Sequence, residues 1–128
     1  MTTAGTAFLI CIAGGIGAAL RFVLDGLIRT RVRSTYPVAT AVINLSGSLV
    51  LGLITGLAAR QLLPPQWHLV LGTGLLGGYT TFSTASFETV RLLEDHRYVA
   101  AVINGLGMLI IGSGAAALGF GIALAATQ

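Results

Sequence analysis

The sequence predicts an all-α membrane protein, a single domain over residues 1–128 that crosses the bilayer with four helices. Of the 128 residues, 55% are hydrophobic and only 9% are charged, whereas a soluble domain averages roughly a quarter charged residues. A soluble helical bundle needs polar faces at helical spacing that are extensive enough to meet water, and none of the four stretches described next has one. Four stretches without Asp, Glu, Lys or Arg reach the length of about 20 residues that a spanning helix needs: residues 1–20, 34–59, 61–87 and 98–128.

The first two helices are bounded by charge and by proline. The first is expected over residues 6–28, and because no Lys or Arg precedes Phe8, the positive region of a cleavable signal peptide is missing. The second is expected to begin at Tyr36 and Pro37, since tyrosine favours the membrane interface and proline the first helical turn. It is expected to end near Arg60. The loop between the two helices is expected to hold Arg29, Arg31 and Arg33.

The third and fourth helices are separated by a strongly polar segment. Two prolines at residues 64–65 precede the third helix, and Trp67 and His68 are expected to anchor it in the headgroup region. Residues 77–81, Gly-Gly-Tyr-Thr-Thr, have weak helix preferences, so the third helix is expected to break there. Its polar exit comprises Glu88, Arg91, Glu94, Asp95, His96 and Arg97, and Tyr98 opens the fourth helix.

Glycine is abundant, with 18 residues, and its spacing predicts close helix packing. Small residues let two membrane helices approach each other closely. Glycines recur every seven residues along the fourth helix in two rows, and Gly–Ala pairs in the first helix offer the same kind of contact. The rows are Gly105, Gly112 and Gly119, and Gly107, Gly114 and Gly121; the pairs are Gly14 with Ala18 and Gly15 with Ala19.

Neither catalysis nor nucleic-acid binding is indicated. One cysteine, two interfacial histidines and four carboxylates near helix ends form neither a nucleophile set nor a buried metal site. The net charge of +3 comes from arginines that mostly flank the expected helices, as membrane topology requires. The middles of the last three helices hold no ionisable residue, which argues against a small multidrug transporter. Asp25 lies too near the end of the first helix to serve as a substitute.

The expected helices carry uncharged hydrogen-bonding groups on particular faces. Asn44 is the most costly of them, because an amide in hydrocarbon must find partners; it either joins helices or lines a polar path. Residues 80–84 follow the expected break, where freed carbonyls are natural ligands for a bare cation, although a plain kink would also account for them. The polar face of the second helix comprises Thr40, Asn44, Gly47, Ser48 and Thr55.

Three segments of the chain resemble signatures of the Fluc/CrcB fluoride channels. Residues 14–21, Gly-Gly-Ile-Gly-Ala-Ala-Leu-Arg, resemble the signature of the family's first helix. Residues 39–48, which contain Thr40, Asn44 and Gly47, resemble its second-helix segment. Residues 77–84, Gly-Gly-Tyr-Thr-Thr-Phe-Ser-Thr, are similar to its third-helix string. Order, spacing and total length agree with the family, and only the fourth helix lacks a sharp match.

The resemblance implies a fluoride-exporting channel in the cell membrane, built as an antiparallel dimer of four-helix subunits with two narrow pores. It also implies one structural sodium ion (Na+) at the dimer centre, held here by the backbone carbonyls of Gly77 and Thr80. Asn44 and Phe82 would line the fluoride path, as donors moderate enough to release the ion. Arg21 would raise the local anion concentration at a vestibule or extend to lipid headgroups. Further pore groups would be Thr40, Ser48, Ser83 and Thr84.

The sequence departs from the family pattern at the third and fourth helices. Ala85 stands where the family usually has a second phenylalanine, and Phe87 follows two residues later. The fourth helix offers only Asn104 and Ser113 where a more regular hydroxyl track is expected. A small-substrate transporter and a non-conducting structural subunit remain open alternatives, because residue chemistry alone predicts only a small membrane protein with a neutral polar path.

A charge bias between the two ends of the bundle is the third departure. Positive loops face the cytoplasm, so the bias predicts cytoplasmic first and third loops and both termini outside. Such a chain suits a pairing with a related subunit of opposite bias, and the alternative is an ordinary homodimer that tolerates the bias. The first and third loops carry Arg29, Arg31, Arg33, Arg91 and Arg97, against Arg60 alone at the opposite end.

Overall fold

The computed structural model describes residues 2–127, which form four helical rods. Met1 and Gln128, the outer ends of the first and last expected stretches, lie outside the described residues. The first rod is α1 (Thr3–Arg31) and the second is α2 (Val38–Ala59). The third comprises α3 (Pro65–His68), η1 (Leu69–Leu76), α4 (Gly77–Tyr79) and α5 (Phe82–Glu94), and the fourth comprises α6 (Tyr98–Val102), η2 (Ile103–Gly107) and α7 (Met108–Ala126).

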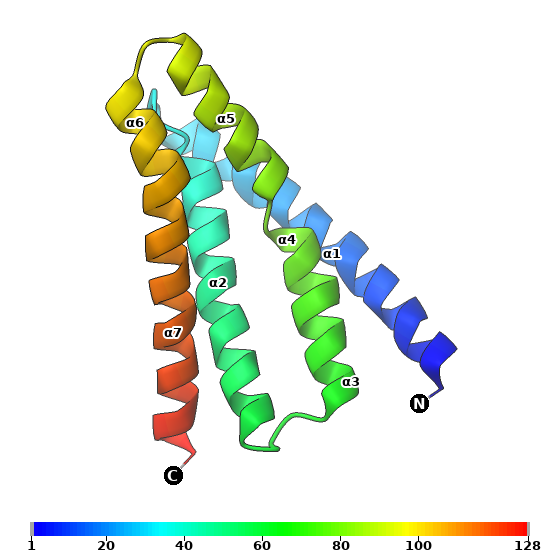
Figure 1. Ribbon diagram of the computed structural model, residues 1–128. Helices are drawn as coiled ribbons and strands as arrows, with labels where there is room; N and C mark the ends of the chain where they lie inside the picture. Colours follow the sequence, from blue (N-terminus) through cyan, green and yellow to red (C-terminus); the bar gives the residue numbers. More distant parts are fainter. Residues whose placement is uncertain (1, 128) are drawn as a thin grey trace.

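The rods alternate in direction, with both chain ends at one end of the bundle (Figure 1). The connection from α2 to α3 lies at that end too, and the other two connections lie at the opposite end. The first, second and fourth rods are each long and apolar enough to cross a membrane. The third rod is divided into pieces that are individually too short. The predicted all-helical, multi-pass class is therefore confirmed, with three candidate spans and a segmented third rod.

The first helix is longer than the sequence predicted. It begins at Thr3, where the Thr2 hydroxyl accepts a hydrogen bond from Gly5 N–H at 3.3 Å, and it continues to Arg31. Assigning Arg29 and Arg31 to a loop was therefore wrong, and of the three arginines only Arg33 lies beyond the helix. The physical reason is that arginine is a good helix former and that a positive side chain is favoured in the last turn by the helix dipole.

Glycine contacts join α2 to the fourth rod. A Cβ atom added at Gly52 would overlap the carbonyl of Ala116, and one added at Gly119 would overlap the carbonyl of Leu49. The row of Gly105, Gly112 and Gly119 faces neighbouring side chains or backbone. The other row makes no close contact with another helix within residues 2–127, because Gly114 and Gly121 have no neighbour within 4 Å of an added Cβ and Gly107 meets only its own helix, so its role in packing stays a prediction.

A second set of glycine contacts fixes the first half of the third rod against α1. An added Cβ at Gly17 would overlap the Leu75 carbonyl, and one at Gly78 would overlap the Gly14 carbonyl. The two backbones therefore touch over about two turns. Because this contact ends at α4, it places α4 beside both α1 and α2, where the third rod changes its course.

Candidate functional site

Two extended residues separate α4 from α5. Thr80 has a ψ angle of 161° and Thr81 has φ and ψ angles of −145° and 121°, whereas Gly77 keeps helical angles of −61° and −38°. The backbone thus leaves the helix at the two threonines and not at the glycine pair. The Thr81 side chain caps the new helix, because its Oγ1 accepts a hydrogen bond from Thr84 N–H at 3.2 Å.

Asn44 of α2 holds the extended backbone with both ends of its amide. Its Nδ2 donates to the Thr81 carbonyl at 2.8 Å, and its Oδ1 accepts from Thr81 N–H at 2.8 Å. A peptide group that has lost its helical partners must find others at membrane depth, and the Asn44 amide supplies both. One N–H of the Nδ2 group remains for a further partner, since a primary amide has two donors.

Arg21 holds the end of α4 from the opposite side. Its Nε donates to the Gly78 carbonyl at 3.1 Å. Arg21 thereby directs its charge to the backbone next to the two extended residues, which we call the interruption of the third rod. Its role at a vestibule stays a prediction. A charge-assisted bond of this kind is about twice as strong as one between neutral groups, so the interruption is fixed from α1 as well as from α2.

The carbonyls of Gly77 and Thr80 are left without helical donors. The N–H of Thr80 goes to Leu76 at 2.9 Å, and that of Thr81 goes to Asn44, so neither reaches Gly77. Both residues line a groove of about 380 Å³ between α2 and the third and fourth rods. Free carbonyl oxygens are ligands that a hard cation accepts, and the groove therefore offers chemistry suited to a sodium ion.

The groove collects most of the predicted site residues. Its lining includes Asn44, Ser48 and Phe82, and Phe82 is 88% exposed. Of the remaining residues on the predicted polar face of α2, Thr55 turns instead toward His68, with 3.2 Å between its Oγ1 and Nε2. Ser83 is exposed on α5 and does not line the groove.

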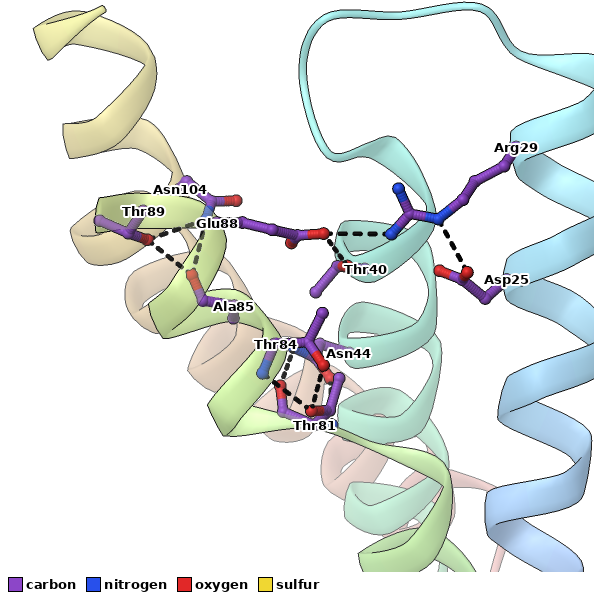
Figure 2. A network of polar contacts seen from close by, with 10 residues as sticks. All are labelled: Asp25, Arg29, Thr40, Asn44, Thr81, Thr84, Ala85, Glu88, Thr89 and Asn104. Carbon is purple, nitrogen blue, oxygen red and sulfur yellow. Dashed lines mark hydrogen bonds and ion pairs between the residues drawn. The ribbon is translucent and has the colours of Figure 1, made fainter. Parts of the chain in front are cut away.

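Predicted and unpredicted residues together form a line of polar contacts between α2 and α5 (Figure 2). We call this line the polar seam. Thr40 Oγ1, in a residue only 2% exposed, donates to Glu88 Oε1 at 2.9 Å. The next contacts lie one turn later on α2 and one turn earlier on α5. There Thr81 Oγ1 donates to Thr84 Oγ1 at 3.0 Å, and Asn44 Nδ2 donates to the Thr81 carbonyl. The polar seam comprises Thr40 and Asn44 of α2, Thr81 just before α5, and Thr84 and Glu88 of α5.

Glu88 connects the polar seam to the charged end of α1. Its Oε1 also accepts from Arg29 Nη2 at 3.1 Å, and Arg29 Nε donates to Asp25 Oδ2 at 2.7 Å (Figure 2). The Glu88 side chain is 14% exposed. Burial raises the pKa of the nearby Tyr36 phenol, and the negative charge of Glu88 adds to that effect. A second cavity of about 420 Å³ is lined by Arg29, Tyr36, Thr84, Glu88, Arg91 and Asp95.

The roles of Glu88, Arg29 and Asp25 in this cluster were not predicted. Glu88 was interpreted as part of the polar exit of the third helix, because it opens a run of charges. The helical period holds part of the missing signal: Glu88 follows Thr84 by four residues, which places both on one face of α5. No sequence signal pointed to Arg29, whose contact with Glu88 joins residues 59 positions apart.

Asn104 joins the fourth rod to α5. It is 2% exposed, and its Nδ2 donates to the Ala85 carbonyl at 3.1 Å and to Thr89 Oγ1 at 2.9 Å. Ala85 therefore takes part through its backbone, whatever the length of its side chain. Ser113, the other polar residue expected to matter in the fourth rod, is exposed on α7 and does not line the groove.

Comparison with known proteins finds one family along most of the chain. A family model described as CrcB-like protein, Camphor Resistance (CrcB), matches residues 8–120. A fluoride-specific ion channel FluC 1 of Leifsonia xyli subsp. xyli is 52% identical over 92% of this chain and 88% of its own. FluC 3 of Bifidobacterium longum is 43% identical over 88% and 93% of the two chains. FluC 2 of Mycobacterium bovis is 42% identical over 94% and 98%.

Proposed function

The chain belongs to the CrcB family, and from that membership we propose that it is a subunit of a fluoride-specific channel of the cell membrane. Fluoride would leave the cytoplasm passively through it, which lowers the toxicity of the ion. The names of the relatives support the choice of ion. The single observation that carries the proposal to this chain is the run of neutral donors along the groove and the polar seam, set between apolar rods.

The chemistry of the donors suits a small, strongly hydrated anion. Such an ion leaves water only where other donors replace its hydration shell, and it leaves the protein only if those donors hold it weakly. The second N–H of Asn44, the hydroxyl of Ser48 and the positive edge of the Phe82 ring are donors of this kind. The residues that line the groove include no lysine or arginine, so a bound anion would meet no positively charged side chain there.

We propose further that two subunits pair antiparallel across the groove, with all four rods of each spanning the membrane. The exposed Phe82 ring and the free carbonyls of Gly77 and Thr80 support this pairing, because lone carbonyls in lipid each cost several kcal/mol. A sodium ion bound to these two carbonyls would supply a positive charge that holds the facing backbones together. The residues present fit such an ion, since their oxygens carry no helical hydrogen bonds.

The orientation of the chain follows from its arginines. We propose that the connections at residues 32–37 and 95–97 face the cytoplasm and that both termini lie outside. The end of the bundle that holds these two connections carries five arginines, whereas the opposite end carries one. An antiparallel dimer of identical chains needs near-equal insertion in both orientations. We therefore favour a partner that is a related chain with the opposite bias, with a homodimer as the alternative.

Fluoride efflux from liposomes that contain the purified chain tests the function. We expect efflux that is fast, passive and selective for fluoride over chloride. Flux that saturates or needs a counter-ion would support a small multidrug-type transporter instead. An assembled protein that gives no flux, alone or with a related subunit, would support a structural subunit and contradict the proposal.

Labelling of tagged loops in cells that express this chain alone tests the orientation. A tag in residues 95–97 should be accessible only from the cytoplasm, and a tag at the C-terminus only from outside. Equal labelling from both faces, together with flux from the single chain, would refute pairing with a second gene product and leave the homodimer.

A further inference from the structure

We propose that Arg29, held in place by Asp25, neutralises Glu88 and so allows an anion to pass along the polar seam. Arg29 is in this view a positioning residue for conduction and not an anion ligand. The inference rests on the proposed function, since it concerns how an anion meets one carboxylate of that path.

Glu88 is the obstacle that requires an explanation. It is the only carboxylate of the polar seam, and its side chain is 14% exposed, so water screens its charge poorly. It lies between the cavity that Arg29 and Thr84 line and the Asn44–Thr81 pair at the groove. An anion that moves from that cavity toward Asn44 would therefore pass an acidic side chain of the same sign.

Arg29 is placed to remove the repulsion. Its Nη2 lies 3.1 Å from Glu88 Oε1, and its Nε lies 2.7 Å from Asp25 Oδ2. The planar guanidinium donates in two fixed directions, so Asp25, one turn earlier on α1, sets the direction in which the second donor points. Without Asp25 the long side chain, which is about half exposed, would be free to turn toward solvent.

No other positive group within residues 2–127 pairs with Glu88. Arg91 lines the same cavity but forms no ion pair with it, and Asp95 adds a further negative charge there. Thr40 donates to Oε1, the oxygen that Arg29 also contacts, while Oε2 is buried without a partner in the described structure. The neutralisation of this carboxylate thus depends on the single contact with Arg29.

The test compares fluoride efflux from liposomes for charge-neutralising variants. Arg29→Gln should lower the flux roughly tenfold or more, which is the size expected when the anion meets the charge of a partly buried carboxylate that is no longer neutralised. Arg31→Gln is the matched control, because it removes the same charge from an exposed residue of the same helix end, and its flux should stay at the wild-type level. Glu88→Gln added to Arg29→Gln should restore the flux to within about threefold of wild type.

The rescue separates a charge effect from a structural one. Glutamine at position 88 keeps an oxygen for the Thr40 hydroxyl but cannot restore an ion pair with residue 29, so a role of that ion pair in folding alone predicts no rescue. Asp25→Asn keeps the arginine but loosens it, and should give an intermediate loss that Glu88→Gln also rescues. This variant carries the test if Arg29→Gln does not fold.

Three outcomes would overturn the inference: equal flux for the Arg29 and Arg31 variants, a double variant as slow as Arg29→Gln, or wild-type flux in Asp25→Asn. Absence of flux from the wild-type protein, with its partner supplied, would instead be a failure of the proposed function. The two failures are therefore distinguishable in one set of measurements.

Discussion

The two halves of the third rod are held by opposite means. η1 and α4 pack mainly backbone to backbone on α1 through Gly17 and Gly78, and the Arg21 side chain adds one hydrogen bond to the Gly78 carbonyl. In α5 only Leu92 is buried, and the helix is held by side-chain hydrogen bonds from Asn44, Thr40 and Asn104. The difference shows that the first half is fixed by shape, whereas the second is fixed by polar groups that also form the candidate site.

The largest expected effect comes from filling the close contact of the first half. Gly17→Val should lower the free energy of unfolding by about 3 kcal/mol or more, because an added Cβ overlaps the backbone carbonyl of Leu75, which cannot move aside as a side chain can. Gly15→Val is the control, since an added Cβ there has no neighbour within 4 Å. Thermal unfolding in detergent and the monodisperse fraction measure both. Similar losses for the two variants would contradict packing by shape.

An intermediate effect on folding is expected from Asn44→Ala in the second half. From the sequence alone, this change and Phe82→Ile should both leave a stable assembly with much reduced flux. The structure adds that Asn44→Ala frees the N–H and carbonyl of Thr81, at a cost of about 1–3 kcal/mol for each group that stays unsatisfied. Fluoride flux should fall more than about tenfold as well.

Phe82→Ile is the comparison for Asn44→Ala, because the ring is 88% exposed in one subunit and makes little contact there. We expect its unfolding free energy to stay within about 0.5 kcal/mol of wild type while its fluoride flux falls. Unfolding and flux measured on the same preparations separate the two roles. A loss of stability in Phe82→Ile as large as in Asn44→Ala would show that both residues serve folding.

The smallest effect is expected at the two connections that bound the third rod. Gln61 and His96 have φ angles of 60° and 56°, in the left-handed region that costs a residue with a side chain roughly 1 kcal/mol or more. Gln61→Gly and His96→Gly should each raise the unfolding free energy by up to about 1 kcal/mol. The gain should be smaller for His96→Gly, because that change also removes the contact between His96 Nδ1 and the Tyr98 hydroxyl. A lower unfolding free energy for Gln61→Gly would contradict backbone strain at this position.

The sequence predicted the positions of the rods well, because stretches without charge are long and proline and arginine mark their ends. It predicted less about the ends and the interruption. Arg29 and Arg31 continue α1, since a charge does not end a helix by itself. The interruption falls within the predicted residues 77–81, but the change of conformation is at Thr80 and Thr81, while Gly78 serves close packing on Gly14.

The polar seam was predictable in part. Asn44, Thr40 and Thr84 were selected as hydrogen-bonding groups at membrane depth, and these residues do lie along one line between α2 and α5. Glu88 and Arg29 were not selected, because their significance depends on a contact between α1 and α5. Such a contact follows from the tilt of α1 across the bundle, and the small residues of α1 predict a close approach but neither its partner nor its angle.

Both ends of the chain lie at the same end of the bundle, and this limits how the gene can be duplicated. Two copies joined head to tail by a short linker would begin and end on the same side of a membrane, so both would insert in the same direction. A fused protein with two oppositely directed halves needs one additional membrane-crossing segment between them. Separate chains in the two orientations require no such segment, so if all four rods cross the membrane as proposed, the even number of crossings favours assembly from separate chains.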